Sequence, residues 1–171
     1  MTTLEFQKNL AEEIKKILSE IITKNADGEK RVGVSVYRQF LPKVLEDDED
    51  ESKFYPFAIV RLDKGITEDD FEAWQVSVDI LLGLFDDDPE TDGNDQIMIL
   101  IQRIVNRFSQ EARLAPNYTC ERQMEWACQD EDTYPYYFGV VSLKFRVPKL
   151  GRSEPIYGRQ KTGYGSYEGY C

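Results

Sequence analysis

The chain has 171 residues, of which 41% are hydrophobic and 31% are charged, a composition typical of one globular domain rather than of a disordered chain. Its net charge of −11 argues against a protein that grips nucleic-acid phosphates, because an acidic surface is repelled by them. No stretch approaches the ~20 apolar residues of a membrane span, and the acidic, interrupted start of the chain predicts no signal peptide. We therefore expect a soluble protein made in the cytoplasm.

The first predicted element is an amphipathic helix that begins at a capping box. Thr2 and Glu5 have the T-x-x-E spacing in which the two side chains cap the first turn of a helix. Apolar residues recur at helical spacing as far as Ile21, and the turn residues 25–28 follow, so the pattern predicts a helix that ends at about Lys24. Its apolar stripe cannot stabilise the helix alone, so we expect it to pack on a sheet.

Five segments carry the period-two alternation, or the short apolar run, that is typical of β-strands. They centre on residues 32–37, 57–60, 74–84, 118–126 and 141–147. A second amphipathic helix interrupts them, with apolar residues at helical spacing from Ile97 to Phe108 after a turn at 92–95. Most of the strands are apolar on one face only. This predicts an α+β fold with an antiparallel or mixed sheet of about five strands and both helices packed on one face.

One domain is expected over residues 1–148, followed by an extended Gly- and Tyr-rich tail over residues 149–171. The tail has too few apolar side chains to fold without a partner, so it is predicted to be flexible. It carries four basic side chains against two acidic ones, and is therefore mildly basic beside an acidic body. We expect it to bind a neighbouring subunit when the protein assembles.

A run of six acidic side chains forms a predicted loop before the second strand. The run consists of Glu46, Asp47, Asp48, Glu49, Asp50 and Glu51. It repels itself and stays solvated, and it lacks the spaced oxygen ligands and the glycine of a Ca²⁺ loop. The same objection applies to the acidic residues at 86–88 and 92–95. A solvated loop is favoured over a metal site, and neither a metal nor a cofactor is expected.

The chain contains no histidine, which removes the commonest general base, the commonest metal ligand and the Ser-His and Cys-His nucleophile pairs. The phosphate-binding patterns GxxxxGK[ST] and GxGxxG are also missing from the sequence. Carboxylate pairs remain, but with 32 acidic residues a close pair is expected by chance. These observations argue against an enzyme, and no catalytic residue is assigned.

Cys120, Cys128 and Cys171 are an odd, small set of cysteines, which is typical of a reducing compartment. If residues 118–128 form one strand, the first two cysteines lie about 26 Å apart, too far for a disulfide. We therefore expect core or half-buried thiols.

Tyr134, Tyr136 and Tyr137 crowd the entry to the last strand. Pro135 among them, like Pro56 earlier in the chain, occupies the strand-opening position where a residue without a backbone N–H is tolerated. We first expect the rings to cover the end of the core. Contact with another subunit is the next alternative, because tyrosine is enriched at interfaces, and stacking on a ligand is the least favoured.

Further candidates for subunit contact lie on the second helix and in the tail. Met98 and Ile99 fall beside the apolar stripe of that helix, and either widen its core face or touch a neighbouring subunit. Tyr157, Tyr164 and Tyr167 give the tail the aromatic side chains that are favoured at protein interfaces.

Three stretches between residues 55 and 148 carry a wider pattern. They read "YPFAIVRLDKG", "WQVSVDILLGLFDDDPETDGNDQIMILIQRIVNRF" and "MEWACQDEDTYPYYFGVVSLKFRVP". The shared features are a YP.AIVRL strand, a long alternating strand with a glycine near its end, a D/N-rich turn into an I..I..R helix, a Glu-Trp pair and a PYYFG strand entry. This pattern resembles the small tail-completion proteins of long-tailed bacteriophages, similar to the lambda tail-terminator class. The acidic run and the tail are specific to this chain.

The resemblance implies a structural virion protein without catalytic turnover. A terminator forms a ring, typically a hexamer, on the last ring of the tail tube, stops tube growth and presents the joining surface for the head-side connector. The implied partners are other copies of the chain, the tail tube protein and neck proteins, and the implied location is the tail or neck of a virion assembled in the host cytoplasm. Double-stranded DNA passes through the ring. From its charge, and not from the resemblance, the acidic loop at 46–51 is a candidate lining of that channel, where like-charge repulsion would keep the duplex from adhering.

Two alternatives stay open at this point. The first is another neck protein, such as a head-closure or head–tail joining factor. The second is a cytoplasmic protein-binding domain that is unrelated to virions.

Overall fold

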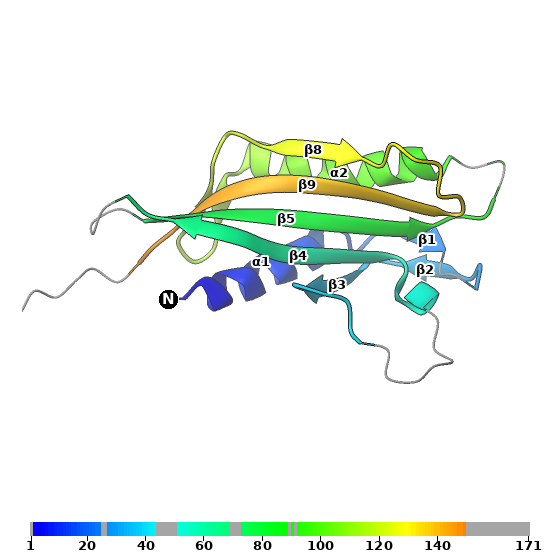
Figure 1. The fold of residues 1–171 in the computed structure, drawn as a ribbon, viewed down its shortest axis with the longest axis horizontal. Helices are drawn as coiled ribbons and strands as arrows, with labels where there is room; N and C mark the ends of the chain where they lie inside the picture. The colour runs from blue at the N-terminus through cyan, green and yellow to red at the C-terminus, as the bar shows by residue number, and fades with distance from the viewer. Residues whose placement is uncertain are drawn as a thin grey trace, which may run out of the picture.

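Two α-helices lie on one face of an open, mostly antiparallel sheet (Figure 1). The computed structural model describes residues 2–24, 27–43, 51–68, 73–88, 90 and 92–149, and of residues 51 and 52 only the backbone. The predicted α+β class is confirmed. The described part of the chain contains nine strands rather than about five, because two predicted strands are each divided and two short strands, β1 and β6, are added.

In chain order, the elements are α1 (Thr3–Ile17), β1 (Ile22–Lys24), β2 (Lys30–Val32), β3 (Ser35–Arg38), the 3₁₀ turn η1 (Glu51–Phe54), β4 (Phe57–Ile66), β5 (Trp74–Phe85), α2 (Gly93–Gln110), β6 (Arg113–Leu114), β7 (Tyr118–Cys120), β8 (Glu125–Cys128) and β9 (Tyr136–Val147).

The long strands β4, β5 and β9 form the centre of the sheet. β5 pairs antiparallel with β9 from Trp74↔Val147 to Phe85↔Tyr136, and antiparallel with β4 on its other side. β3 lies parallel to β4 at one edge, and β8 lies antiparallel to β9 at the opposite edge (Figure 1). β7 and β6 continue the sheet beside the far end of β9, while β1 and β2 attach at the end of β5.

The core lies between this sheet and the two helices. The ring of Phe6 on α1 lies 5.0 Å from the rings of both Tyr118 and Phe145. The ring of Phe108 on α2 lies 5.3 Å from that of Phe145. Because both helices meet the same strand residue, they cover the same face of the sheet, as the one-faced alternation of the strands predicts.

Helix α1 is shorter than the sequence predicts. Its start is as expected, since Thr2 Oγ1 accepts a hydrogen bond from the Glu5 N–H at 3.2 Å. The helix ends at Ile17, however, and residues 22–24 pair with β2 instead. Leu18 and Ile21 remain buried beyond the helix end, so apolar residues keep helical spacing where the helix itself has stopped.

Two predicted strands are each divided. The predicted strand at 32–37 breaks at Gly33, whose φ of +83° favours glycine, and becomes β2 and β3. The predicted strand at 118–126 becomes β7 and β8, which pair with different parts of β9. Neither helix of the described part of the chain has the length and apolar character needed to cross a membrane.

The two described cysteines are free thiols, as expected. Cys120 is buried on β7, and Cys128 is half-buried on β8. Burial, and secondarily the charge of Glu121, raises the pKa of Cys120 to about 12. Burial also raises the pKa of Cys128, so both thiols stay protonated at neutral pH.

Candidate functional site

The aromatic stretch at the start of β9 is divided between the two faces of the sheet. Tyr136 points to the face without helices, where its ring lies 5.0 Å from that of Tyr55 and 5.4 Å from that of Phe85. The ring of Tyr55 also lies 4.9 Å from that of Phe57. These four rings close the end of the sheet on the face away from the core, so Tyr136 has a structural role there instead of covering the end of the core as the sequence favours first.

Tyr137 and Tyr134 have different surroundings. Tyr137 covers the first turn of α2, where a Cβ placed on Gly93 would lie 2.2 Å from its ring. Burial, followed by the charges of Asp86 and other nearby acids, raises its pKa. Tyr134 is 53% exposed, although its hydroxyl donates to the Asp87 carbonyl oxygen at 2.9 Å. Of the three tyrosines, Tyr134 is the one available for an external contact.

Met98 and Ile99 on α2 also differ in their surroundings. Met98 is half-buried against the core, and the Cys128 Sγ lies 3.4 Å from its Sδ. Ile99 is 50% exposed and lines an open apolar groove of about 270 Å³ together with Ile22 of β1. The prediction of a wider core face therefore fits Met98, whereas Ile99 lies on the surface.

Several predicted site residues lie outside the described residues. These are Glu46, Asp47, Asp48, Glu49 and Asp50 of the acidic run, and Tyr157, Tyr164 and Tyr167 of the tail. Glu51 begins η1, but its side chain is not described. The DNA-channel role of the run and the interface role of the tail therefore stay predictions.

A groove between α1 and the edge strand β3 was not predicted from the sequence. Two adjoining hollows of about 460 and 660 Å³ share Ala11, Val36 and Tyr37 among their lining residues. Polar and apolar groups line the groove in about equal measure, and four basic side chains with one acidic side chain stand around it. The charged residues are Lys8, Lys15, Arg31, Arg38 and Glu12. The side chain of Phe40 stands 74% exposed at one end.

The opposite edge of the sheet presents a tryptophan and several acids. Trp126 on β8 is 54% exposed, although it lies directly opposite the fully buried Val141 of β9. The alternation of 118–126 assigns Trp126 to the core face, and its side chain does point that way. It remains exposed because β8 is the last strand on this side. Exposed acids flank the tryptophan: Glu125, Asp130, Glu131 and Asp132.

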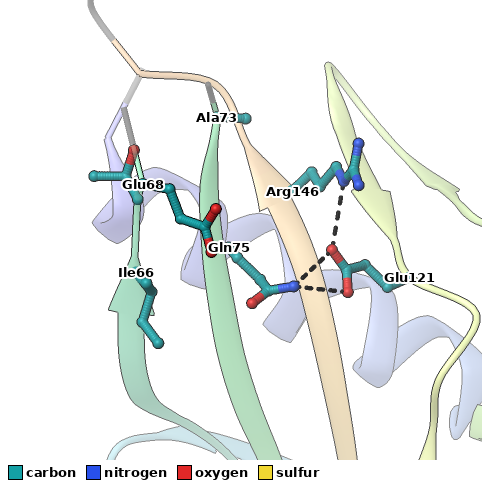
Figure 2. Close-up of a pocket in the computed structure, with 7 residues that line it drawn as sticks. Ile66, Glu68, Ala73, Gln75, Glu121 and Arg146 are labelled. Carbon is teal, nitrogen blue, oxygen red and sulfur yellow. Dashed lines mark hydrogen bonds and ion pairs between the residues drawn. The ribbon is translucent and has the colours of Figure 1, made fainter. Parts of the chain in front are cut away.

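A polar groove lies at the end of β4 and β5, with a volume of about 370 Å³. Figure 2 shows Gln75 and Arg146 reaching from neighbouring strands toward Glu121. The Gln75 Nε2 lies 2.9 Å from both carboxylate oxygens of Glu121, and the Arg146 Nε lies 3.4 Å from Oε1. Because these side chains satisfy one another, the groove is better explained as a polar end of the sheet than as a ligand site.

The acidic residues after β5 form hydrogen bonds with neighbouring groups of the chain. The buried Asp86 accepts from Gln96 Nε2 at 2.7 Å and from the Asp88 N–H at 3.1 Å. The pKa of Asp88 is lowered, first by the Glu90 N–H and then by Lys24. Among the residues with described positions, no group of three or more Cys, Asp or Glu side chains is arranged to hold a metal ion.

No protein-family model matches the chain, and no curated protein matches its sequence. Its function is therefore argued from its residues and geometry. Two features of the described surface stand out for that purpose. They are the basic groove beside β3 and the acidic edge that carries Trp126.

Proposed function

We propose that this chain is a structural protein of a bacteriophage virion, a tail terminator. In this role it caps the tail tube as a ring, a hexamer being the family's usual form, and forms the joining surface for the head-side connector. DNA passes through the ring during packaging and ejection. The partners are other copies of the chain, the tube protein and the neck proteins on the head side.

The observation that carries this proposal is that the two edges of one sheet carry different exposed aromatic side chains. Trp126 stands exposed at the β8 edge, and Phe40 stands exposed beyond the β3 edge. Exposed aromatic side chains of this kind are typical of protein interfaces. A twofold dimer needs one self-complementary patch, whereas two different patches fit a head-to-tail contact, which closes into a ring when the rotation allows it.

The residues that carry the resemblance support the same proposal. They supply β4, β5, α2, β8 and β9, which are the three central strands, the second helix and one edge. The similarity thus falls on the elements that give the sheet its shape, rather than on scattered surface loops. We therefore carry over the assembly role of the family and no catalytic role.

The acidic run and the tail have separate parts in this proposal. Residues 46–51 line the channel, where like-charge repulsion keeps the duplex from adhering. Residues 149–171 bind a neighbouring subunit, with the ordering cost met by the contact. Normal ring formation and tail joining after deletion of residues 150–171 would reject the role given to the tail.

Tail length provides the test of the main proposal. Phage that lack this chain are expected to assemble overlong tubes, and the purified chain added to polymerising tube protein is expected to cap the tubes and stop their growth. Electron microscopy measures both effects. Leaky heads with free tails of normal length would instead identify a head-closure protein. A monomer or dimer without affinity for tubes would favour a cytoplasmic binding domain.

A further inference from the structure

We infer that β8 of one copy pairs antiparallel with β3 of the next copy, and that Trp126 of the first enters the groove between α1 and β3 of the second. The inference rests on the proposed ring function, because it identifies the contact by which copies join. It assigns the two unlike edges of the sheet to each other, with a second copy of this chain as the occupant of the groove.

The two edges lie at the same level of the sheet. Cα partners can be followed across all five strands from one edge to the other, through β8, β9, β5, β4 and β3. One such row runs Trp126, Val141, Ile80, Val60, Arg38; the next runs Ala127, Val140, Leu81, Ile59, Tyr37. A copy placed beside another without a shift along the strands therefore brings β8 against β3.

The strand directions are compatible with a ladder. β3 runs parallel to β4, and each further step across the sheet, to β5, β9 and β8, reverses the direction. β8 is therefore antiparallel to β3. A ring axis roughly parallel to the strands keeps this relationship between neighbouring copies. Within the described ranges, each edge strand pairs on one side only, which leaves backbone groups for strand addition.

Trp126 lies on the same face of the sheet as the groove. Its cross-strand partner Val141 belongs to the core, and directly opposite residues of an antiparallel pair point the same way. The indole therefore lies on the helix side of the sheet. The groove lies on that side too, because α1 forms one wall and Val36 packs against the core from β3. Ala11, Val34 and Val36 give the ring apolar contacts, and the planar guanidinium of Arg38 can stack on it.

The charges of the two edges are complementary. Glu125 lies one row beyond Trp126, at the level of Gln39, and points to the face without helices, so it does not take part in this match. The acids at 130–132 continue from the other end of β8, toward the level of Arg31 and Lys15. Basic side chains outnumber the acidic Glu12 on the groove. Pairing two β3 edges, or two β8 edges, would bring like charges together, so the charges favour contact between unlike edges.

The test uses two full-length variants that each damage one edge. Trp126→Ala removes the proposed anchor, and the double variant Lys15→Glu, Arg38→Glu reverses the charge of the groove. Trp74→Ala is the matched control for the first, because Trp74 is a partly exposed tryptophan at the far end of the sheet. Lys64→Glu, Arg113→Glu is the control for the second, since both side chains are exposed away from the groove. Thermal melting by circular dichroism checks that all variants fold.

Sedimentation velocity measures assembly. The wild type and both controls are expected to form closed oligomers, and each edge variant is expected to show a self-dissociation constant raised by roughly 30-fold or more, as for an interface hot spot. A 1:1 mixture of the two edge variants retains one intact pair of edges, so it is expected to form heterodimers that grow no further.

Three results would overturn the inference. They are folded edge variants that assemble like the wild type, a mixture that stays monomeric, and a wild-type chain that is monomeric at about 1 mM, where even weak self-association is visible. Tail length tests the proposed function separately. Edge variants that still form rings and still limit tubes would leave the terminator role standing with a different subunit contact.

Discussion

The side-chain amide of Gln7 joins α1 to the end of β3, where Nε2 donates to Gln39 Oε1 at 2.6 Å. The same nitrogen donates to the Val60 carbonyl at 2.9 Å. Gln39 in turn accepts from the Leu62 N–H at 2.7 Å and donates to the Leu62 carbonyl at 3.2 Å. Its amide thus takes the place that a strand backbone would have beside β4. This pairing ends β3 and fixes one end of the groove beside α1.

Gln39→Ala is expected to lower the free energy of unfolding by about 1–3 kcal/mol, because the Leu62 N–H and the Gln7 amide lose their partner. Urea denaturation measures the change. Gln102→Ala, at an exposed site on α2, serves as the control and should alter stability by less than about 0.5 kcal/mol. Equal effects of the two substitutions would contradict the bridging role.

Gly83 and Gly65 provide a matched pair on the β4–β5 ladder. A Cβ at Gly83 would stand 2.4 Å from the ring of Phe57, whereas a Cβ at Gly65 would make an ordinary 3.5 Å contact with Trp74. We expect Gly83→Ala to cost about 1–3 kcal/mol through overpacking. Gly65→Ala should be neutral or stabilise by about 0.4–1 kcal/mol, because it restricts the unfolded chain. Urea midpoints of both variants check this, and a stable Gly83→Ala protein would refute the close packing.

Asp86 holds the turn between β5 and α2 through its hydrogen bonds to Gln96 and the Asp88 N–H. Asp86→Ala is expected to destabilise the protein by about 1–3 kcal/mol, since it leaves these part-buried donors without their acceptor. Asp87→Ala removes an exposed carboxylate one residue later and should have little effect. Thermal unfolding of the two variants distinguishes a specific bonding role from a general effect of acidic charge in this turn.

The buried thiol of Cys120 makes stability depend on alkaline pH. Its pKa rises from 9.0 to about 12 on folding, so the folded protein keeps a proton that the unfolded chain releases. The contribution is fully present below pH 9 and is lost as the pH rises toward 12. The wild type should therefore lose stability with pH more steeply than Cys120→Ala in this window, by up to about 1.4 kcal/mol per pH unit. Parallel slopes would show that the thiol is not the cause.

The acidic run offers a test of the channel. Under the proposed function, replacement of Asp47, Asp48, Asp50 and Glu51 by serine should leave ring assembly intact and slow the passage of DNA, because it removes the proposed repulsion between the run and the duplex. Ejection kinetics of phage that carry the variant measure this. Normal kinetics would reject a lumen position for the run.

Long elements with one continuous apolar stripe were predictable from the sequence. The alternation over 74–84 identifies β5 almost to the residue, and the spacing from Ile97 to Phe108 identifies most of α2. Each of these patterns reports burial along a single element. The apolar stripe of α1 gave a wrong prediction beyond Ile17, because Leu18 and Ile21 are buried although they lie in a segment that is not helical.

The division of the 118–126 strand shows a second limit. Cys120 pairs with Phe145 and Glu125 with Ser142, so the segment between the first pair and the second has two more residues than the facing part of β9. An even excess leaves the inside–outside alternation unchanged, and the pattern therefore gives no sign of the break. The exposure of Trp126 and the groove beside β3 were not predictable either, because they depend on which strands end the sheet.

The pairing of β5 with β9 has a consequence for synthesis of the chain. About fifty residues separate Phe85 from Tyr136, so this ladder cannot close until the last strand has left the ribosome. A chain that stops short of Tyr136 would leave one long side of β5 unpaired, with an apolar row from Val76 to Leu84 beside it. Prematurely terminated products should therefore aggregate or be degraded, and the cell would accumulate only full-length copies competent for assembly.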